Sequence, residues 1–292
     1  MSYRTIFLEP DWLHIRYLGW TDAWPDPCLR VMTRRDGPVI RHLLVSDLPG
    51  ARAEELSAWI VTDSSAFAEI TVHDLDGSPE VEAALFATGF VELQEERMLN
   101  RHTLVIDLAR DEGALLAEMN ADTRRKLRLS EREGVSIRFD CGSDPAERNR
   151  FLGAFNAMAS ERDLSRMPAG ELDSLLADGH SRLAGAFAAE GDAACYVLTY
   201  EAGKTALFHQ GASDGAPDPL LGRALHWALI RQLKQEGLRW YDFGGLPTID
   251  PANGITRFKL GFGGEVVDLG REYRLSGIVP RLARQAKRML GR

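Results

Sequence analysis

Apolar residues alternate with polar ones in some stretches of the chain and recur every three or four positions in others, which predicts strands and helices respectively. Over residues 1–100 these stretches are short, and turn residues such as those at 35–38 separate them. One helix begins at Pro79 and ends at Gly89, the order that helices prefer. The predicted elements of this part are strands over 29–32, 39–45 and 67–72 and helices over 53–60 and 79–88.

From residue 102 the predicted elements are longer. An alternating strand over 102–108 leads into a helix that Asp111 caps and Gly134 ends. The best-defined helix covers 219–236, with Asp218 as its cap. The other predicted elements are strands over 135–139, 182–188, 194–200, 205–211 and 238–243 and helices over 145–162 and 169–176.

The change in element length near residue 100 suggests a domain boundary, and a chain of 292 residues is expected to form about two domains. We predict an N-terminal domain over 1–100, a second domain over 101–275 and a basic C-terminal helix over 276–292. Antiparallel strands, a helix and a further strand in the second domain are typical of an α/β fold with a mixed sheet. Such sheets usually bind ligands at the ends of strands. The last predicted strand, 238–243, ends in a glycine pair and is therefore the expected place for a ligand.

Composition limits the class of protein. Apolar residues make up 45% and charged residues 27% of the chain, as in soluble globular proteins. No apolar run approaches the roughly 18–20 residues that cross a bilayer, and the N-terminus lacks the apolar core of a signal peptide. We therefore expect a cytoplasmic protein without a transmembrane segment.

The cysteines and histidines form no metal-binding pattern. Cys28, Cys141 and Cys195 are far apart and odd in number, which argues against both a disulfide framework and a zinc site. The seven histidines show no His-x-x-x-His spacing. We expect neither a metal nor a cofactor.

Positive charge is concentrated in two segments, although the net charge of the chain is −8. Residues 124–138 hold six cations and two acids, and residues 281–292 hold five cations and no acid. Arg124, Arg128 and Arg132 lie four apart, so they share one face of a helix. Such islands favour local contacts with anions over general coating of nucleic acid, and a solvated helix face is the alternative for each.

Glycines frame a single lysine near the end of the chain. The run Tyr241-Asp-Phe-Gly-Gly-Leu-Pro247 ends a predicted strand in a glycine pair, and Gly254-Ile-Thr-Arg-Phe-Lys-Leu-Gly-Phe-Gly-Gly264 follows it. Glycines let the backbone turn sharply and approach a ligand, and a lysine beside such turns is suited to stabilise a negatively charged reacting oxygen. Plain turn chemistry is the alternative explanation.

Six runs between residues 100 and 275 carry a family resemblance through their order. They read Thr103-Leu-Val-Ile-Asp-Leu, Thr123-Arg-Arg-Lys-Leu-Arg-Leu-Ser-Glu-Arg-Glu-Gly-Val, His209-Gln-Gly-Ala-Ser-Asp, Leu225-His-Trp-Ala-Leu-Ile, Gly237-Leu-Arg-Trp-Tyr-Asp-Phe-Gly-Gly and Phe258-Lys-Leu-Gly-Phe-Gly-Gly. In this order they resemble the FemABX aminoacyl-tRNA-dependent transferases. The resemblance implies two GNAT-like domains, the N-terminal one smaller and irregular.

The resemblance also implies a reaction, in which an amino acid moves from aminoacyl-tRNA to an amine and forms an amide bond. The acceptors in this family are usually peptidoglycan precursors, and some relatives act on small metabolites. The chain is short for a peptidoglycan-building member and lacks the charged helical arm of some of them. We therefore expect aminoacyl-tRNA as one partner and a small-molecule or peptide amine as the other.

The lysine of the family's Phe-Lys pair corresponds to Lys259, and the resemblance implies that it stabilises the oxyanion of the reaction. With a reference pKa of about 10.4 a lysine is charged at neutral pH, so this role is electrostatic rather than that of a base. Phe258 corresponds to an aromatic suited to stack on the terminal adenine of tRNA. We assign the stripe of Arg124, Arg128 and Arg132, together with Arg257, to tRNA phosphates.

The acceptor is expected to lie along the strands that precede this lysine. Related sequences often carry tyrosines where this chain has Phe208 and Gln210, which suggests a different acceptor. His209 orients or deprotonates the amine in one interpretation and is a satisfied strand histidine in the other. Asp242 is either the acceptor of a backbone N–H bond in an Asx-type turn or a proton acceptor. The candidates for this region are Phe208, His209, Gln210, Tyr241, Asp242, Gly244 and Gly245.

Two other functions compete with this hypothesis. A GNAT-type acyl-CoA N-acyltransferase binds pyrophosphate at a helix start of the form Arg/Gln-x-x-Gly-x-Gly/Ala, and Pro219-Leu-Leu-Gly-Arg-Ala224 keeps only its second half. A non-catalytic binding module is disfavoured by the intact Phe258–Lys259 pair. For the C-terminal helix, contact with tRNA, contact with an anionic membrane surface and packing on the body all remain open.

Overall fold

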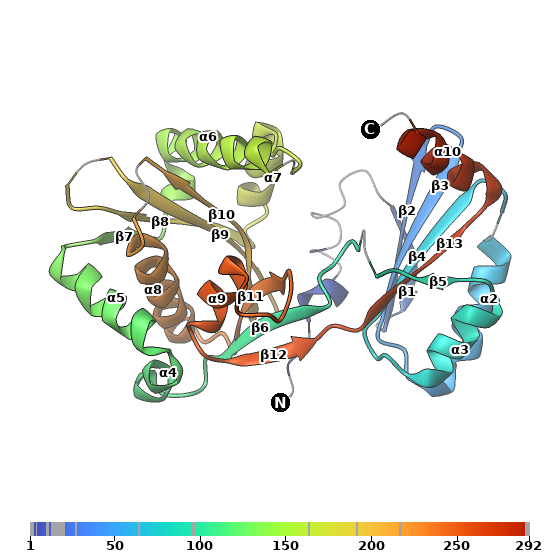
Figure 1. The fold of residues 1–292 in the computed structure, drawn as a ribbon, viewed down its shortest axis with the longest axis horizontal. Helices are drawn as coiled ribbons and strands as arrows, with labels where there is room; N and C mark the ends of the chain where they lie inside the picture. Colours follow the sequence, from blue (N-terminus) through green and yellow to red (C-terminus); the bar gives the residue numbers. More distant parts are fainter. Residues whose placement is uncertain are drawn as a thin grey trace. The chain divides into compact units, whose positions relative to one another are not determined.

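The computed structural model divides the chain into two compact units (Figure 1). The larger unit comprises Met1–Tyr3 and Thr103–Val267, and the smaller unit comprises Arg4–His102 and Asp268–Arg292. The residues that the structure describes are 3, 5–9, 12, 21–26, 28–63, 65–94, 97–162, 164–190, 192–215 and 218–289.

The smaller unit is a six-stranded sheet with helices on both faces. Its strand order is β1 (Thr21–Asp26), β2 (Leu29–Asp36), β3 (Val39–Ser46), β4 (Ala68–Asp74), β13 (Arg271–Ser276) and β5 (Val91–Glu92). The sheet is mixed, since β3 and β4 pair in parallel whereas the other neighbours are antiparallel. Its helical segments are η1 (Ile6–Leu8), η2 (Gly50–Arg52), α2 (Ala53–Asp63), α3 (Pro79–Ala87) and α10 (Ile278–Met289).

Different helices cover the two faces of this sheet. Ala68, Ile70 and Val72 of β4 belong to an apolar core that includes residues of α2 and α3. Glu69 alternates with them and faces the other side, where it pairs with Arg284 of α10. The helices α2 and α3 therefore cover the face of this core, and α10 lies on the opposite face beside Glu69.

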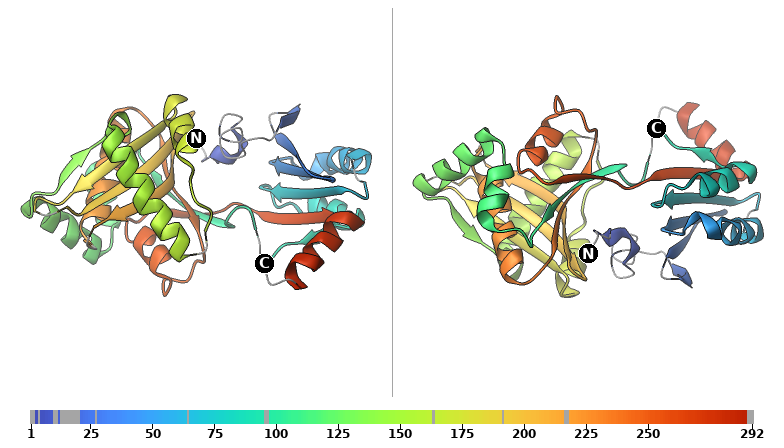
Figure 2. Two further views of the ribbon diagram at one scale, coloured as in Figure 1. Left: turned by 90° about the horizontal axis from the view of Figure 1, so that it is seen from above. Right: turned by 90° about the horizontal axis from the view of Figure 1, so that it is seen from below.

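The C-terminal end of the chain belongs to the smaller unit, which corrects two predicted boundaries. We expected the second domain to run to residue 275 and a separate helix to follow it. Instead β13 pairs with β4 over six residue pairs and lies beside β5. Figure 2 shows this red strand within the blue-to-cyan sheet. The backbone of β4 would lack a hydrogen-bonding neighbour on this side without β13, so 268–292 completes the smaller unit.

A buried His–Glu pair joins β4 and β13. The side chains of His73 and Glu272 are both fully buried, with Nδ1 3.1 Å from Oε1. The other ring nitrogen of His73 lies 2.7 Å from the Leu269 carbonyl oxygen. Glu272 also accepts hydrogen bonds from the backbone N–H groups of Met98 (2.8 Å) and Leu99 (2.7 Å). Glu272 thus connects β13 both to β4, through His73, and to the segment that contains Met98 and Leu99.

The larger unit contains a seven-stranded mixed sheet. Its strand order is β12 (Glu265–Asp268), β6 (His102–Asp107), β11 (Trp240–Leu246), β10 (Thr205–Asp214), β9 (Ala194–Ala202), β8 (Ser181–Phe187) and β7 (Ser136–Arg138). Its helical segments are α4 (Glu112–Glu118), α5 (Ala121–Arg132), η3 (Cys141–Ser143), α6 (Pro145–Glu161), α7 (Ala169–Ala177), α8 (Leu221–Gln235) and α9 (Gly254–Leu260). The apolar face of α8 packs in the main core, with Leu225 and Leu229 fully buried.

Local hydrogen bonds explain where the helices differ from prediction. The helix expected from Asp111 to Gly134 is interrupted, because Met119 is extended and the Asn120 side chain caps a new helix by accepting the Thr123 N–H (2.8 Å). The helix expected from residue 219 begins at Leu221.

Candidate active site

The strands β10 and β11 part at the point where the candidate residues gather. They pair in parallel only from Thr205–Trp240 to Leu207–Asp242. One residue later the register of β10 against β9 shifts between Phe208 and Gln210, which makes His209 a β-bulge. Bulges redirect side chains and are common beside active sites.

A cavity of about 700 Å³ opens beside this bulge. Residues of α6, β9, β10, α8 and α9 line it, so distant parts of the chain converge there. Its lining includes Tyr196, Phe208, Arg223, His226 and Phe258. The cavity is large enough for a small organic ligand and combines aromatic walls with a cation.

The first turn of α8 borders this cavity through Gly222 and Arg223. No side chain caps the helix, because Asp218 accepts the Leu220 N–H (2.7 Å) instead. The Arg223 guanidinium lies 5.2 Å from the Phe258 ring centroid, and its Nε has no partner among the described residues. An uncapped helix start therefore borders the cavity beside the half-buried Arg223, which pairs with Asp122 (3.4 Å).

Phe258 and Lys259 lie on a helix rather than in the predicted turn. The Asn253 side chain caps α9 by accepting the N–H groups of Ile255 (3.0 Å) and Thr256 (3.1 Å). Phe258 lines the cavity, whereas Lys259 is only 7% exposed. The helix thus presents the aromatic ring to the cavity and directs the lysine inward.

The Lys259 ammonium is held at the end of β11. It donates to the carbonyl oxygens of Gly245 (2.9 Å) and Gly244 (3.3 Å), and Nζ lies 5.5 Å from the Phe208 ring centroid. Burial lowers the pKa of Lys259 to about 8, against the opposing charge of Asp242. The side chain is therefore largely protonated at pH 7, but less completely than the reference pKa implied.

Glycine is required at position 244. Its φ of +69° lies in the left-handed region, and an added Cβ would stand 2.8 Å from the Phe208 carbonyl oxygen. Asp242 stabilises this turn by accepting the Gly244 N–H (2.7 Å), which confirms the Asx-type interaction. It also accepts hydrogen bonds from Tyr3 and Thr103, and burial raises its pKa.

Tyr241 lies in the core and not at the cavity. Its side chain is fully buried, and its hydroxyl is 2.7 Å from Nδ1 of His226. Burial, with a contribution from the Lys259 charge, lowers the pKa of His226 to about 3, so the ring is neutral at pH 7. Sequence patterns missed His226 and Arg223. His226 lies three residues before Leu229 on the apolar stripe of α8, and this spacing was the available sign that its ring is buried.

The other predicted site residues do not gather at the cavity. Of the candidates Phe208, His209 and Gln210, the described lining of the cavity includes Phe208 alone. Arg124 donates to the carbonyls of Met119 and Ala117 (3.3 Å), so it closes the end of α4. The remaining arginines, Arg128, Arg132 and Arg257, are exposed.

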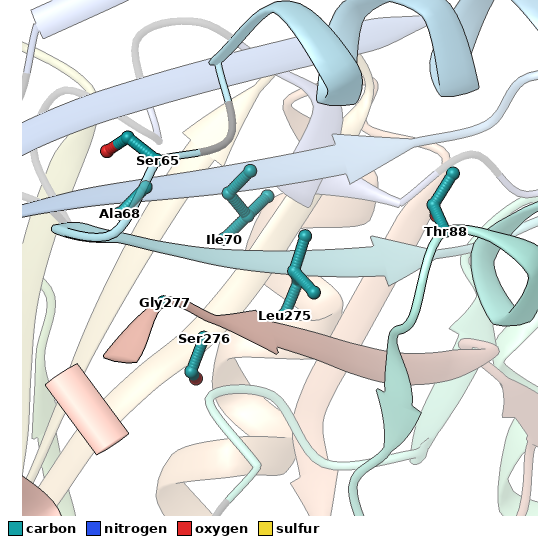
Figure 3. Close-up of a pocket in the computed structure, with 7 residues that line it drawn as sticks. All are labelled: Ser65, Ala68, Ile70, Thr88, Leu275, Ser276 and Gly277. Atoms are coloured by element: carbon teal, nitrogen blue, oxygen red, sulfur yellow. The ribbon is translucent and has the colours of Figure 1, made fainter. Parts of the chain in front are cut away.

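Other chemistries find little support here. Cys195 lines the cavity, but burial raises the pKa of its thiol, which disfavours a thiolate nucleophile. Among the residues described, no three His, Cys, Asp or Glu side chains are grouped to hold a metal ion. A second cavity of about 300 Å³ in the smaller unit, shown in Figure 3, has no titratable lining residue.

Comparison with known proteins identifies the fold. Residues 117–260 match the family model described as "Acetyltransferase (GNAT) domain". No curated protein matches the chain in sequence. No helix within the described ranges is long and apolar enough to cross a membrane.

Among solved structures, the chain is similar to FemX, with a TM-score of 0.71 and 15% identity over 96% of this chain and 94% of that one. It is also similar to the C-terminal domain of a putative lysylphosphatidylglycerol synthetase from Agrobacterium fabrum (TM-score 0.60, 12% identity, 92% and 89% covered). A third similar structure is L-PGS from Bacillus licheniformis (TM-score 0.57, 13% identity, 94% and 90% covered). The resemblance to FemABX-like proteins is confirmed at the level of the fold, since the chain has a GNAT-like fold with a FemX-like arrangement of elements.

Proposed function

We propose that this protein transfers an amino acid from aminoacyl-tRNA to the amine of a small-molecule or peptide acceptor, forming an amide bond. The observation that carries the proposal is the Phe258–Lys259 pair: the aromatic ring lines the cavity and the lysine is buried behind it as a cation. The fold shared with FemX supports the same class of reaction.

The chemistry of the reaction requires such a cation. The amine attacks the ester carbonyl, the C–N bond forms, and the C–O bond to the ribose breaks, so negative charge develops on oxygen until the proton lost by the amine is taken up by the departing ribose hydroxyl. An α-amine with a pKa near 7.7–8.0 is partly unprotonated at neutral pH, so the need for a strong base is modest. The developing oxyanion is stabilised by the Lys259 ammonium, whose position against two backbone carbonyls fixes it before the donor binds.

Access to the ammonium passes Phe208. This ring lines the cavity and lies 5.5 Å from Nζ, and Lys259 itself does not line the cavity in the part of the chain described. A bound ester therefore has to enter beside the Phe208 ring. The Phe208 ring then replaces part of the water around the ester. The lower local polarity strengthens the attraction between the developing oxyanion and the Lys259 ammonium.

A second candidate function, acyl transfer from acyl-CoA, is favoured by one observation. The uncapped start of α8 opens on the cavity beside Arg223, and helix starts of this kind bind phosphate groups. The start of α8 beside Arg223 equally suits the phosphates next to the terminal adenosine of tRNA. Acyl-CoA and aminoacyl-tRNA both carry phosphates, so an experiment has to distinguish the two donors.

The donor is identified by following a labelled amino acid. Purified protein, a pool of labelled aminoacyl-tRNA and a mixture of amines are expected to yield labelled amide, and ribonuclease treatment of the tRNA beforehand is expected to abolish it. Acetyl-CoA with the same amines is the parallel reaction. Amide formation from acetyl-CoA alone, unaffected by ribonuclease, contradicts the proposal and supports the second candidate.

Charge reversal at both Arg128 and Arg132 is expected to weaken tRNA binding and to lower the slope of log affinity against log salt by about 0.7–0.9 for each phosphate that is no longer neutralised. Both side chains are exposed on α5, whereas Arg124 is engaged at the end of α4. Binding is measured by filter retention over a range of salt concentrations. The control is Arg35→Glu on the smaller unit, an equally exposed arginine. An unchanged slope in the double variant places the tRNA elsewhere.

A further inference from the structure

The helix α10 carries a row of exposed apolar side chains. Ile278, Leu282 and Met289 are spaced by four and seven residues, so they share one face of the helix. Their exposed fractions are 61%, 57% and 82%. A stripe of this length is unusual on a surface helix, where single exposed apolar residues are normal but an aligned row is not.

Polar contacts hold the opposite face of α10 against the sheet. Arg284 pairs with Glu69 and donates to the Ser276 hydroxyl (2.6 Å), and Arg281 donates to the Ser276 carbonyl (3.0 Å). The Val279 N–H donates to the Ala66 carbonyl (3.0 Å) and fixes the start of the helix.

The side on which α10 lies can be followed in the close-up of the sheet. Figure 3 shows the Ser276 side chain on one side of β13 and the Leu275 side chain on the other, together with Ile70. The contacts of Ser276 therefore place α10 on the face opposite the apolar core. A surface helix ordinarily buries its apolar stripe, whereas α10 turns Arg284 towards the sheet and exposes Ile278, Leu282 and Met289.

The charge of the segment indicates what covers this stripe. Residues 278–292 contain no acid and five cations, Arg281, Arg284, Lys287, Arg288 and Arg292. Two copies of α10 packed along a two-fold axis would bring these like charges together, which disfavours self-association. Nucleic acid would complement the cations but leave the apolar row in water. The surface of an anionic bilayer complements both.

We propose that α10 binds the interface of an anionic membrane, with Ile278, Leu282 and Met289 inserted among the lipid chains and the exposed Arg281 beside the headgroups. The helix α10 belongs to the smaller unit, whereas the residues that line the cavity belong to the larger unit, so this contact does not use the cavity. The inference does not depend on the identity of the acyl donor.

The test measures sedimentation of the full-length protein with vesicles, in the absence of any donor. We expect binding to phosphatidylcholine vesicles that contain phosphatidylglycerol and weaker binding to phosphatidylcholine alone. Leu282→Asp is expected to lower the partition coefficient by about tenfold or more, since it replaces an inserted side chain by a charged one. The control is Ile249→Asp on the larger unit, whose side chain is also 57% exposed.

Circular dichroism establishes that both variants are folded. Equal loss of binding in the two variants, or equal binding of wild-type protein to neutral and anionic vesicles, overturns the proposal. It is also overturned if the protein ignores vesicles and elutes as a dimer that Leu282→Asp separates, because a second copy then covers the stripe. Retention on heparin without any vesicle binding points to nucleic acid and has the same consequence.

Discussion

Replacing Lys259 by methionine is expected to lower the rate of acyl transfer by about two orders of magnitude, the usual cost of losing one oxyanion-stabilising group. Methionine is similar in length and apolar, so it fills the buried site while removing the charge. The carbonyls of Gly244 and Gly245 lose their donor, which costs some stability but leaves the sheet and α9 in place.

The rate is measured in single turnover with labelled aminoacyl-tRNA, and folding is checked by circular dichroism. The matched control is Lys204→Met, because Lys204 also donates to a backbone carbonyl, that of Gly237 (3.2 Å), but is exposed and distant in the sheet from the cavity. A Lys259→Met variant with near-normal rates contradicts the electrostatic role.

The pH dependence of the rate separates a cation from a base at this position. Burial lowers the pKa of Lys259 to about 8, and only the protonated form carries the charge. If the charge stabilises the oxyanion, its contribution is present below pH 8 and is lost as the pH rises through this value. A base would show the opposite trend, with a rate that rises through pH 8. Because the acceptor α-amine also loses its proton near pH 7.7–8.0, we compare the ratio of the wild-type rate to the rate of the methionine variant, and we expect this ratio to fall as the pH rises through 8.

Replacing Glu272 by alanine is expected to lower the free energy of unfolding of the smaller unit by about 3–5 kcal/mol. The change removes one partner of a fully buried pair and leaves the His73 ring without its carboxylate. It also leaves the N–H groups of Met98 and Leu99 without an acceptor. Three groups therefore lose their hydrogen-bond partner at once, which places the change well above a typical substitution.

Because the chain forms two units, this loss is best measured locally, as faster amide hydrogen exchange in β4 and β13. The control is Glu82→Ala, since Glu82 pairs with Arg271 (3.1 Å) at the surface and is expected to contribute within about 1 kcal/mol. Equal effects of the two substitutions would show that the buried pair contributes no more than a surface ion pair.

Sequence patterns predicted most elements of the larger unit and the region of the site, because both depend on local periodicity and on glycine turns. They missed the helical character of α9, since its seven residues lie between glycines and its cap is an asparagine two residues after Pro251. They placed Tyr241 at the site because alternation alone does not tell which face of a central strand is open. His226 and Arg223 reach the cavity only through the packing of α8 beside α9, which is a long-range contact.

The position of β13 was beyond prediction for a related reason. Residues 271–276 read as a continuation of the preceding segment, and nothing local indicates that they pair with a strand two hundred residues earlier. Pairing at such distance is decided by the edge that β4 offers, which belongs to the tertiary fold.

This strand has a consequence for how the protein is made. β13 lies between β4 and β5 in its sheet, so a strand that is synthesised after the whole larger unit separates two strands that are synthesised before it. On the ribosome, residues 4–102 emerge long before their partner, while 103–267 emerge as an uninterrupted block. The larger unit is thus able to fold before β13 has emerged from the ribosome, and the smaller unit is completed only once β13 has emerged. A chain truncated after Val267 would keep the larger unit with its cavity but would lack β13. The edge of β4 would then be unpaired, which favours aggregation.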